Sequence, residues 1–153
     1  FYDARGTLFT GLRTLQVERG TPIAGLPRHS LKLGAQWQVS ATLSVGADAQ
    51  AFSRTGAQGN EDGLIADPVA GEALRRADLA IRGYGLLSMR ASWEPATRWE
   101  LYARLDNVLD RRYASFGAVG RNLFGTATGS DANTRFVAPG APRMLRFGVR
   151  YRY

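Results

Sequence analysis

Arginine is the residue type most able to bind a charged partner in this 153-residue sequence. Of the 20 basic residues only Lys32 is not arginine, and 13 acidic residues leave a net charge of +7. Guanidinium groups bind carboxylates and other anions through paired N–H donors. The basic residues are spread along the chain rather than gathered in one tract, so we expect an anionic ligand or carboxylate partners rather than nucleic acid.

Metal and catalytic chemistry have little raw material in this chain. The sequence has no cysteine and a single histidine, His29. A thiolate metal site is therefore excluded, and a histidine-based catalytic triad is not expected. Gly83-Tyr84-Gly85 is not followed by a helical pattern, so it does not read as a phosphate-binding loop. We expect a protein that is not an enzyme and holds no metal or cofactor.

Arginine and aromatic residues occur together in a segment from about residue 118 to 142. Arg121 and Arg135 could bind a negatively charged small molecule, and Phe124 and Phe136 could stack on it. These four residues are the candidate ligand contacts. The alternative is an ordinary solvated loop.

The elements that must position these residues are predicted to be β-strands. Polar and apolar residues alternate with a period of two through the end of the chain, from Leu145 to Tyr153. The same alternation predicts four earlier strands, at about residues 28–38, 41–54, 84–94 and 98–107. The last of these is expected to continue past a break at 107–110 to about residue 117, and residues 1–5 could end a further strand.

The connections between these strands alternate in length. Tight turns are predicted at residues 39–40 and 95–97, and long segments at 6–27, 55–81 and 118–142. Short turns on one side and long loops on the other are typical of an antiparallel transmembrane β-barrel. The alternative is a soluble β-sandwich that serves as a binding module. The sequence has no apolar run long enough for a transmembrane helix.

Tryptophan distribution supports the membrane interpretation. Trp37, Trp93 and Trp99 all fall beside the short turns and on the apolar face. Tyr151 and Tyr153 reach the same level in the last strand. Amphipathic rings favour the boundary between lipid and water, so we expect these residues to form a membrane girdle.

The polar face is expected to line the interior of the barrel. Its charged residues could guide an anionic ligand, or they could form a hydrated wall of cross-strand ion pairs. The predicted charged positions are Lys32, Asp48, Arg54, Arg90, Glu94, Glu100, Arg104, Asp106, Arg146, Arg150 and Arg152.

Five or six strands are too few to close a membrane barrel, for which about eight is the minimum. An open sheet edge in lipid leaves backbone groups without partners. We therefore expect the chain to be part of a larger barrel and not to fold alone.

Three stretches resemble the TonB-dependent outer-membrane receptors. Leu101–Tyr113 is similar to the family's penultimate strand, and its motif residues are Asn107, Leu109, Asp110 and Tyr113. Val108-Leu109 stands where Leu-Phe or Leu-Leu is usual. Pro139–Arg143 resembles the lead into the last strand, and Gly25–His29 the lead into an earlier one.

The final residues also resemble the general assembly signal of outer-membrane barrels. Its positions are matched by Arg146, Gly148, Tyr151 and the terminal aromatic Tyr153. This resemblance implies that the barrel-assembly machinery reads the last strand, where an unpaired edge offers backbone groups for strand addition.

The family resemblance implies that residues 1–153 are the carboxyl-terminal segment of a 22-stranded barrel in a Gram-negative outer membrane. The plug domain and the motif that engages TonB would lie elsewhere in the same parent chain. The implied partners are that plug, TonB, outer-membrane lipid and a small-molecule ligand. The implied function is import of a scarce nutrient, above all a ferric-siderophore complex, with haem, cobalamin or a saccharide as the other ligands. A passive porin-like or structural barrel is the alternative.

Overall fold

The computed structural model describes residues 3, 5–9, 14–67, 73–76, 78–121 and 133–153. Within these residues the regular secondary structure consists of β-strands. This confirms the predicted all-β class. Every pair of neighbouring strands is antiparallel. No helix in these ranges is long and apolar enough to cross a membrane.

The chain divides into two compact units. The sheet unit comprises residues 29–52, 84–113 and 140–153, and the hairpin unit comprises residues 1–28, 53–83 and 114–139.

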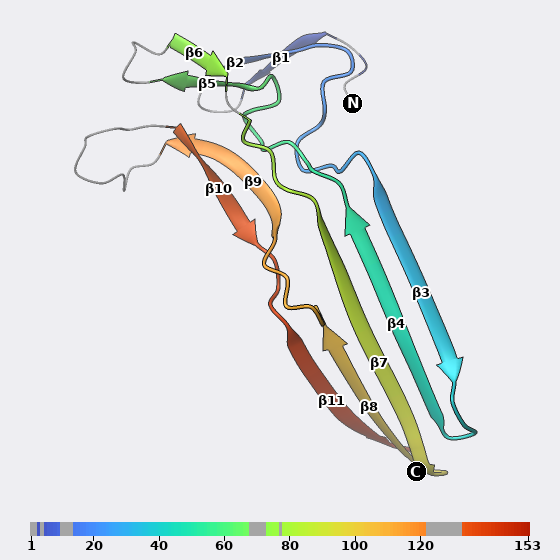
Figure 1. Ribbon diagram of the computed structural model, residues 1–153. Coiled ribbons are helices and arrows are strands. Elements are labelled where there is room, and N and C mark those ends of the chain that lie inside the picture. Colours follow the sequence, from blue (N-terminus) through green and yellow to red (C-terminus); the bar gives the residue numbers. More distant parts are fainter. Residues whose placement is uncertain (1–2, 4, 10–13, 68–72, 77, 122–132) are drawn as a thin grey trace, which may run out of the picture. The chain divides into compact units, whose positions relative to one another are not determined.

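The sheet unit holds one five-stranded antiparallel sheet (Figure 1). Its order is β11-β8-β7-β4-β3, so neighbours in the chain are neighbours in the sheet. These strands are the five that the alternation predicts, with slightly shifted ends. Their bounds are β3 (Ser30–Gln38), β4 (Leu43–Phe52), β7 (Tyr84–Ala96), β8 (Trp99–Asp106) and β11 (Met144–Tyr151).

The register of the sheet separates apolar from polar side chains across all five strands. One row of opposed residues runs Trp37, Val45, Ala91, Ala103 and Phe147. The adjacent row runs Gln36, Gly46, Arg90, Arg104 and Arg146. Opposed residues share a face and neighbouring rows alternate. The sheet therefore has one apolar and one polar face, as predicted.

The apolar face is strongly exposed in this chain. Phe147 is 82% and Trp37 is 68% exposed, and Leu33 and Leu145 are exposed as well. An apolar area of this extent on a sheet calls for lipid or another apolar partner.

Two tight turns connect strands of the sheet. Between β3 and β4, the Val39 amide donates to the Leu43 carbonyl at 2.9 Å, and the Ser40 hydroxyl accepts from the Leu43 amide at 3.1 Å. Between β7 and β8, Ala96 lies opposite Trp99. Both turns are short and lie near the predicted positions, but the first covers residues 39–42 rather than 39–40, and the second covers residues 97–98 rather than 95–97.

The hairpin unit contains three two-stranded hairpins where long connections were predicted. They pair β1 (Gly6–Phe9) with β2 (Thr14–Val17), β5 (Leu64–Asp67) with β6 (Ala73–Arg76), and β9 (Ala114–Arg121) with β10 (Asn133–Pro139). A strand resumes after the break as β9, but it begins at Ala114 and ends at Arg121 rather than at about residue 117, and it pairs with β10 outside the five-stranded sheet. The possible strand at residues 1–5 lies largely outside the described residues.

A small apolar core stabilises the hairpin unit. It consists of buried side chains from β2, from β5 and from the segments that flank β5 and β6. They are Leu15, Val17, Ala57, Ile65 and Ile81. Every buried hydrophobic side chain among the described residues belongs to this unit.

Candidate functional site

Three arginines lie side by side on the polar face of the sheet. Arg90, Arg104 and Arg146 are directly opposed on β7, β8 and β11. Asp48 forms an ion pair with Arg90, and Asp106 forms ion pairs with Arg146 and, at 2.8 Å, with Arg104. Like charges that face each other across strands repel, and the two aspartates offset this repulsion between the arginines.

A second cluster of charges surrounds Glu100. Its carboxylate accepts hydrogen bonds from Ser92 at 2.9 Å, Arg150 at 2.7 Å and Arg152 at 3.3 Å. Arg152 also lies 3.7 Å from Glu94. The predicted wall of cross-strand ion pairs is thus present on this face.

Arg54 lies two residues beyond the end of β4 at Phe52. It belongs to the hairpin unit, where it pairs with Asp78 at 2.9 Å. The bridge between Thr55 and Ile81 keeps the register in which β4 pairs with β7, so the placement of Arg54 on the polar face stays a prediction.

Glycines make room for the long side chains of this face. A Cβ atom on Gly46 would lie 2.8 Å from the Arg90 guanidinium carbon. A Cβ atom on Gly148 would clash with the Tyr102 hydroxyl oxygen. Gly148, one of the predicted assembly-signal residues, therefore also has a packing role.

The motif residue Asn107 closes the break after β8. It is 4% exposed and has a positive φ of 49°. Its amide nitrogen donates to the carbonyls of Arg111 at 3.0 Å and Ala141 at 3.1 Å, and its amide oxygen accepts from the Arg111 amide at 2.9 Å. One side chain thus bonds three backbone groups that the strand break removes from the ladder.

Two further motif residues join the break to the segment before β11. Asp110, also at φ 49°, accepts from the Arg143 amide at 3.3 Å. The ring of Tyr113 covers Gly140 so closely that an added Cβ would clash with the ring. The stretches 107–113 and 139–143, which resembled family motifs separately, therefore pack against each other. Leu109 is exposed.

Tyr113 also ends a row of three aromatic rings that the sequence analysis missed. Its centroid lies 4.4 Å from that of Tyr84, which lies 5.1 Å from that of Phe52. Phe52 and Tyr84 are opposed residues at the polar-face positions of β4 and β7. Phe52 is two residues from Gln50, and Tyr84 is four residues from Ser88. This even spacing puts each ring on the same strand face as its polar neighbour, and it was the signal that could have placed the rings there.

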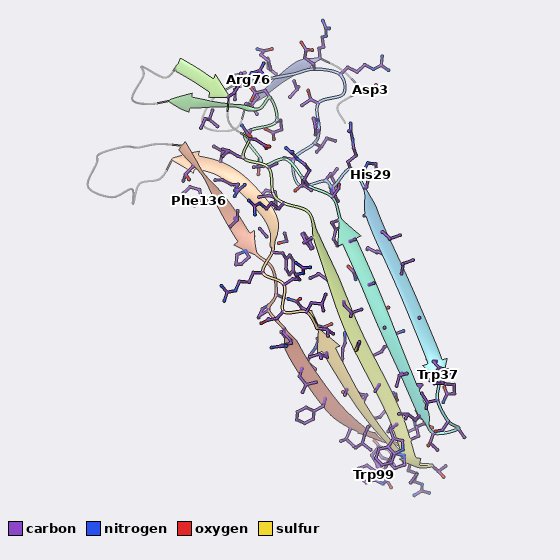
Figure 2. All side chains as sticks on the ribbon, in the orientation of Figure 1. Asp3, His29, Trp37, Arg76, Trp99 and Phe136 are labelled. Atoms are coloured by element: carbon purple, nitrogen blue, oxygen red, sulfur yellow. The ribbon has the colours of Figure 1, made fainter. Side chains whose placement is uncertain are left out.

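The tryptophans lie where the sequence predicted them. All three are on the apolar face next to the tight turns, and Figure 2 labels Trp37 and Trp99 in that part of the sheet. The Trp99 ring lies 4.9 Å from that of Tyr151, which lies 6.3 Å from that of Tyr153.

The four candidate ligand contacts are not brought together as one described site. Phe124 lies outside the described residues, and only the backbone of Arg121 is described. Arg135 donates to the carbonyls of Ala80 at 2.7 Å and Leu79 at 3.2 Å, so its guanidinium braces the hairpin unit. Phe136 is exposed and packs next to Gly120.

Metal-binding geometry was also assessed over the described part of the chain. Nowhere in it do three histidine, cysteine or acidic side chains gather in a group that could hold a metal ion.

A family comparison decides among the barrel interpretations. Residues 2–108 match the family model described as TonB dependent receptor-like, beta-barrel. The chain belongs to this family. The two-faced sheet and the interlocked motifs thus belong to the barrel of a TonB-dependent receptor. No curated protein sequence matches the chain.

Solved structures of TonB-dependent receptors show the same fold. The chain is similar to the ferric-catecholate import receptor Fiu from E. coli K12, with 18% identity, a TM-score of 0.56 and coverage of 82% of this chain and 15% of Fiu. The ferripyoverdine receptor of the Pseudomonas aeruginosa outer membrane is 17% identical with a TM-score of 0.53, and the match covers 82% of this chain and 14% of that receptor. FpvAI in its complex with pyocin S2 is 16% identical with a TM-score of 0.57, and the match covers 91% of this chain and 15% of FpvAI.

The likeness is one of fold, and it covers a small part of each receptor. The chain spans 14–15% of the length of these three solved proteins. Their family is one of outer-membrane transport receptors rather than enzymes.

Proposed function

We propose that the chain is the carboxyl-terminal part of the barrel of an outer-membrane receptor that imports a ferric-siderophore complex with energy supplied through TonB. The observation that carries the proposal is the family match over residues 2–108. Similarity in fold to receptors for ferric catecholate and ferripyoverdine supports the choice of ligand. On this proposal the plug domain and the TonB-contacting motif belong to the rest of the parent chain.

The two faces of the sheet take separate roles in this proposal. The apolar face contacts outer-membrane lipid, with Trp37, Trp93 and Trp99 at the periplasmic boundary. The polar face, with its paired arginines, lines the lumen around the plug. The last strand, β11, with Arg146, Gly148, Tyr151 and Tyr153, is the segment that the barrel-assembly machinery reads.

Iron uptake in the bacterium that encodes the parent protein tests this proposal. We expect deletion of the gene to abolish uptake of radioactive iron supplied as a catecholate or pyoverdine-type complex under iron limitation. The full-length gene should restore uptake, and removal of TonB should abolish it again.

Two results would contradict the proposal. Unchanged uptake of every ferric complex after deletion would exclude siderophore import. Uptake that needs the gene but persists without TonB would instead identify a passive, porin-like barrel.

A further inference from the structure

A groove crosses the apolar face of the five-stranded sheet. Its volume is about 490 Å³, within the range of about 300–1,000 Å³ that is typical of small-molecule sites. Every residue that lines it belongs to the sheet unit. Its exposed lining is almost entirely apolar. A polar occupant would lose its hydrogen bonds to water there without replacement, so the groove suits an apolar one.

Alanine side chains form the floor of the groove. Ala35 and Ala47 are opposed on β3 and β4, and Ala91 and Ala103 are opposed on β7 and β8. The second pair lies on the next apolar row along the sheet, so the floor runs obliquely across four strands. Strand spacings of about 4.8 Å make it about 14 Å long across the sheet. Half of a bilayer's hydrocarbon thickness is about 15 Å, so the floor has the length of an acyl chain in one leaflet.

Large side chains stand on both sides of this floor. They are Trp37 and Val45 on one side, and Met89, Leu105 and Leu145 on the other. Trp37 is 68% and Leu145 is 64% exposed, so both project beyond the alanine methyl groups. The groove is therefore bounded by two walls and is not merely a patch of small residues.

The width of the groove does not suit a peptide. On β7, Ala91 lies between Met89 and Trp93, whose Cα atoms are about 13 Å apart at the usual rise of a strand. The two large side chains fill part of that distance. An α-helix with its side chains is about 10–12 Å wide, and an extended peptide would bring backbone groups without partners into an apolar site. A single hydrocarbon chain has neither problem.

Trp37 places one end of the groove at the level of the tight turns. It is the second-last residue of β3, beside the turn at residues 39–42. Short turns face the periplasm in outer-membrane barrels. The groove therefore opens toward the periplasmic leaflet, which consists of phospholipid.

Arg98 provides a cation at the same level. It is exposed in the two-residue turn between β7 and β8, directly before Trp99. Its carbonyl accepts from the Arg152 amide at 2.9 Å, which ties the turn to the residues after β11. Among the residues that the structure describes, none forms an ion pair or hydrogen bond with the Arg98 guanidinium. The guanidinium can therefore donate to a phosphate through paired N–H groups.

The separation of Arg98 from the groove fits the length of a phospholipid. Ala103 is five residues from Arg98 on β8, or about 17 Å along the strand. A lipid with its phosphate at the turn extends its chains past the tryptophans and into the hydrocarbon region at this depth. The unpaired positive charge favours an anionic headgroup over a zwitterionic one.

We propose that the groove and Arg98 together bind one anionic phospholipid of the periplasmic leaflet. One acyl chain lies over the alanine floor, and the phosphate contacts Arg98. Lipid chains elsewhere in the bilayer are as apolar as this groove, so its advantage for the chain is close packing between the walls. The inference rests on the proposed placement of the sheet in the membrane, but not on the ligand that the receptor imports.

Native mass spectrometry of the full-length receptor, released from detergent after incubation with phosphatidylglycerol, tests the inference. We expect the wild type to retain one phosphatidylglycerol that the variants hold less tightly. Ala91→Leu fills the floor and should weaken its binding by about tenfold. Arg98→Gln should weaken it by about threefold and remove the preference for phosphatidylglycerol over phosphatidylethanolamine.

Matched controls separate the groove from the rest of the surface. Ala51→Leu adds the same volume to the apolar face of β4 outside the groove. Arg112→Gln removes an exposed arginine of the sheet unit beyond the break after β8. Both should retain the lipid as the wild type does. The gel mobility of the folded barrel checks every variant, and Arg98→Gln, in an exposed turn, keeps the test decisive if Ala91→Leu does not fold.

Three results would overturn the inference. One is a wild-type receptor that retains no phosphatidylglycerol. Another is lipid binding that Ala91→Leu and Arg98→Gln change no more than their controls do. The third is retention of lipopolysaccharide in place of phospholipid, which would put the groove in the other leaflet. None of these bears on iron uptake by the gene-deletion strain, and loss of the siderophore proposal would leave the lipid site standing, so the two failures are distinguishable.

Discussion

Asn107 shows how one side chain makes an interrupted strand possible. The chain leaves the β8 ladder at this residue, and three backbone groups of Arg111 and Ala141 then need new partners. The buried amide supplies both donors and an acceptor. Buried backbone groups without partners cost about 1–3 kcal/mol each, so the identity of this residue matters more than its size.

Replacing Asn107 tests that role directly. We expect Asn107→Ala to lower the free energy of unfolding of the full-length barrel by about 2–4 kcal/mol, from the lost hydrogen bonds and the positive φ. Asn107→Gly also loses the amide but tolerates φ 49°, so it should cost about 1 kcal/mol less. Urea titration monitored by the gel mobility of the folded barrel measures both. Wild-type stability in Asn107→Ala would rule out the role.

At the scale of single elements, the pairing of β8 with β7 and β11 depends on its aspartate. Arg104 is directly opposite Arg90 on one side and Arg146 on the other, and Asp106 pairs with both Arg104 and Arg146. The carboxylate therefore offsets repulsion between β8 and β11, in addition to making hydrogen bonds.

Asp106→Asn should destabilise the barrel by about 1 kcal/mol, because it leaves two arginines opposed. Added salt screens that repulsion, so the deficit should shrink as the salt concentration rises. The double variant Asp106→Asn with Arg146→Gln should recover much of the loss. A deficit that is independent of salt and unrelieved by the second substitution would mean that repulsion is not its cause.

The segment between β6 and β7 carries a pH-sensitive contact. A carboxylate whose pKa is lowered in the folded state contributes stability above its unfolded pKa, about 3.9 for aspartate, and this contribution disappears as the pH falls through the lowered folded value. Asp78 is such a group, since the Ala80 amide and Arg54 lower its pKa. We expect its anchoring of residues 78–80 to be constant near neutral pH and to be lost in strong acid.

Hydrogen exchange of the Ala80 amide in wild type and Asp78→Asn measures this effect. The wild-type amide should be the more protected at about pH 6, and the two proteins should converge once the pH falls below the lowered folded pKa of Asp78, where both side chains are neutral. A difference that persists unchanged at the lower pH would show that the charge of Asp78 has no part in it.

Strands with long alternation could be predicted from the sequence, and short ones could not. The alternation in β3, β4, β7, β8 and β11 extends over eight residues or more. β1, β2, β5 and β6 have four residues each, in which alternation cannot be told from chance. The break at Asn107 was predictable because its local sequence is distinctive.

Long-range partners in the candidate sites were harder to predict. The Arg135 guanidinium donates hydrogen bonds to carbonyls more than 50 positions away in the chain, and Arg54 pairs with Asp78, which is 24 positions away. Both pairings depend on how separate connections meet, which periodicity does not encode.

At the scale of the whole molecule, the described chain exposes many large apolar side chains and buries few. The sheet exposes much of its apolar face, and β3 and β11 each pair with one neighbour within the described residues. Apolar area and open ladder edges on this scale favour association with further strands and with lipid.

We therefore predict that residues 1–153 alone in aqueous buffer show no cooperative thermal unfolding transition. The few buried side chains of the hairpin unit are too small a core to offset the entropy of the chain. Circular dichroism and calorimetry of the isolated polypeptide would check this. A sharp transition with matching calorimetric and van't Hoff enthalpies would contradict it.

Because all three tryptophans lie beside the tight turns, their fluorescence can be used to measure depth in a membrane. The segments outside the five-stranded sheet contain no tryptophan. On the proposed membrane girdle, indole emission from this part of the receptor would report a single level of the bilayer. In vesicles of lipids brominated at different acyl positions, quenching of these indoles would measure how deep that level lies.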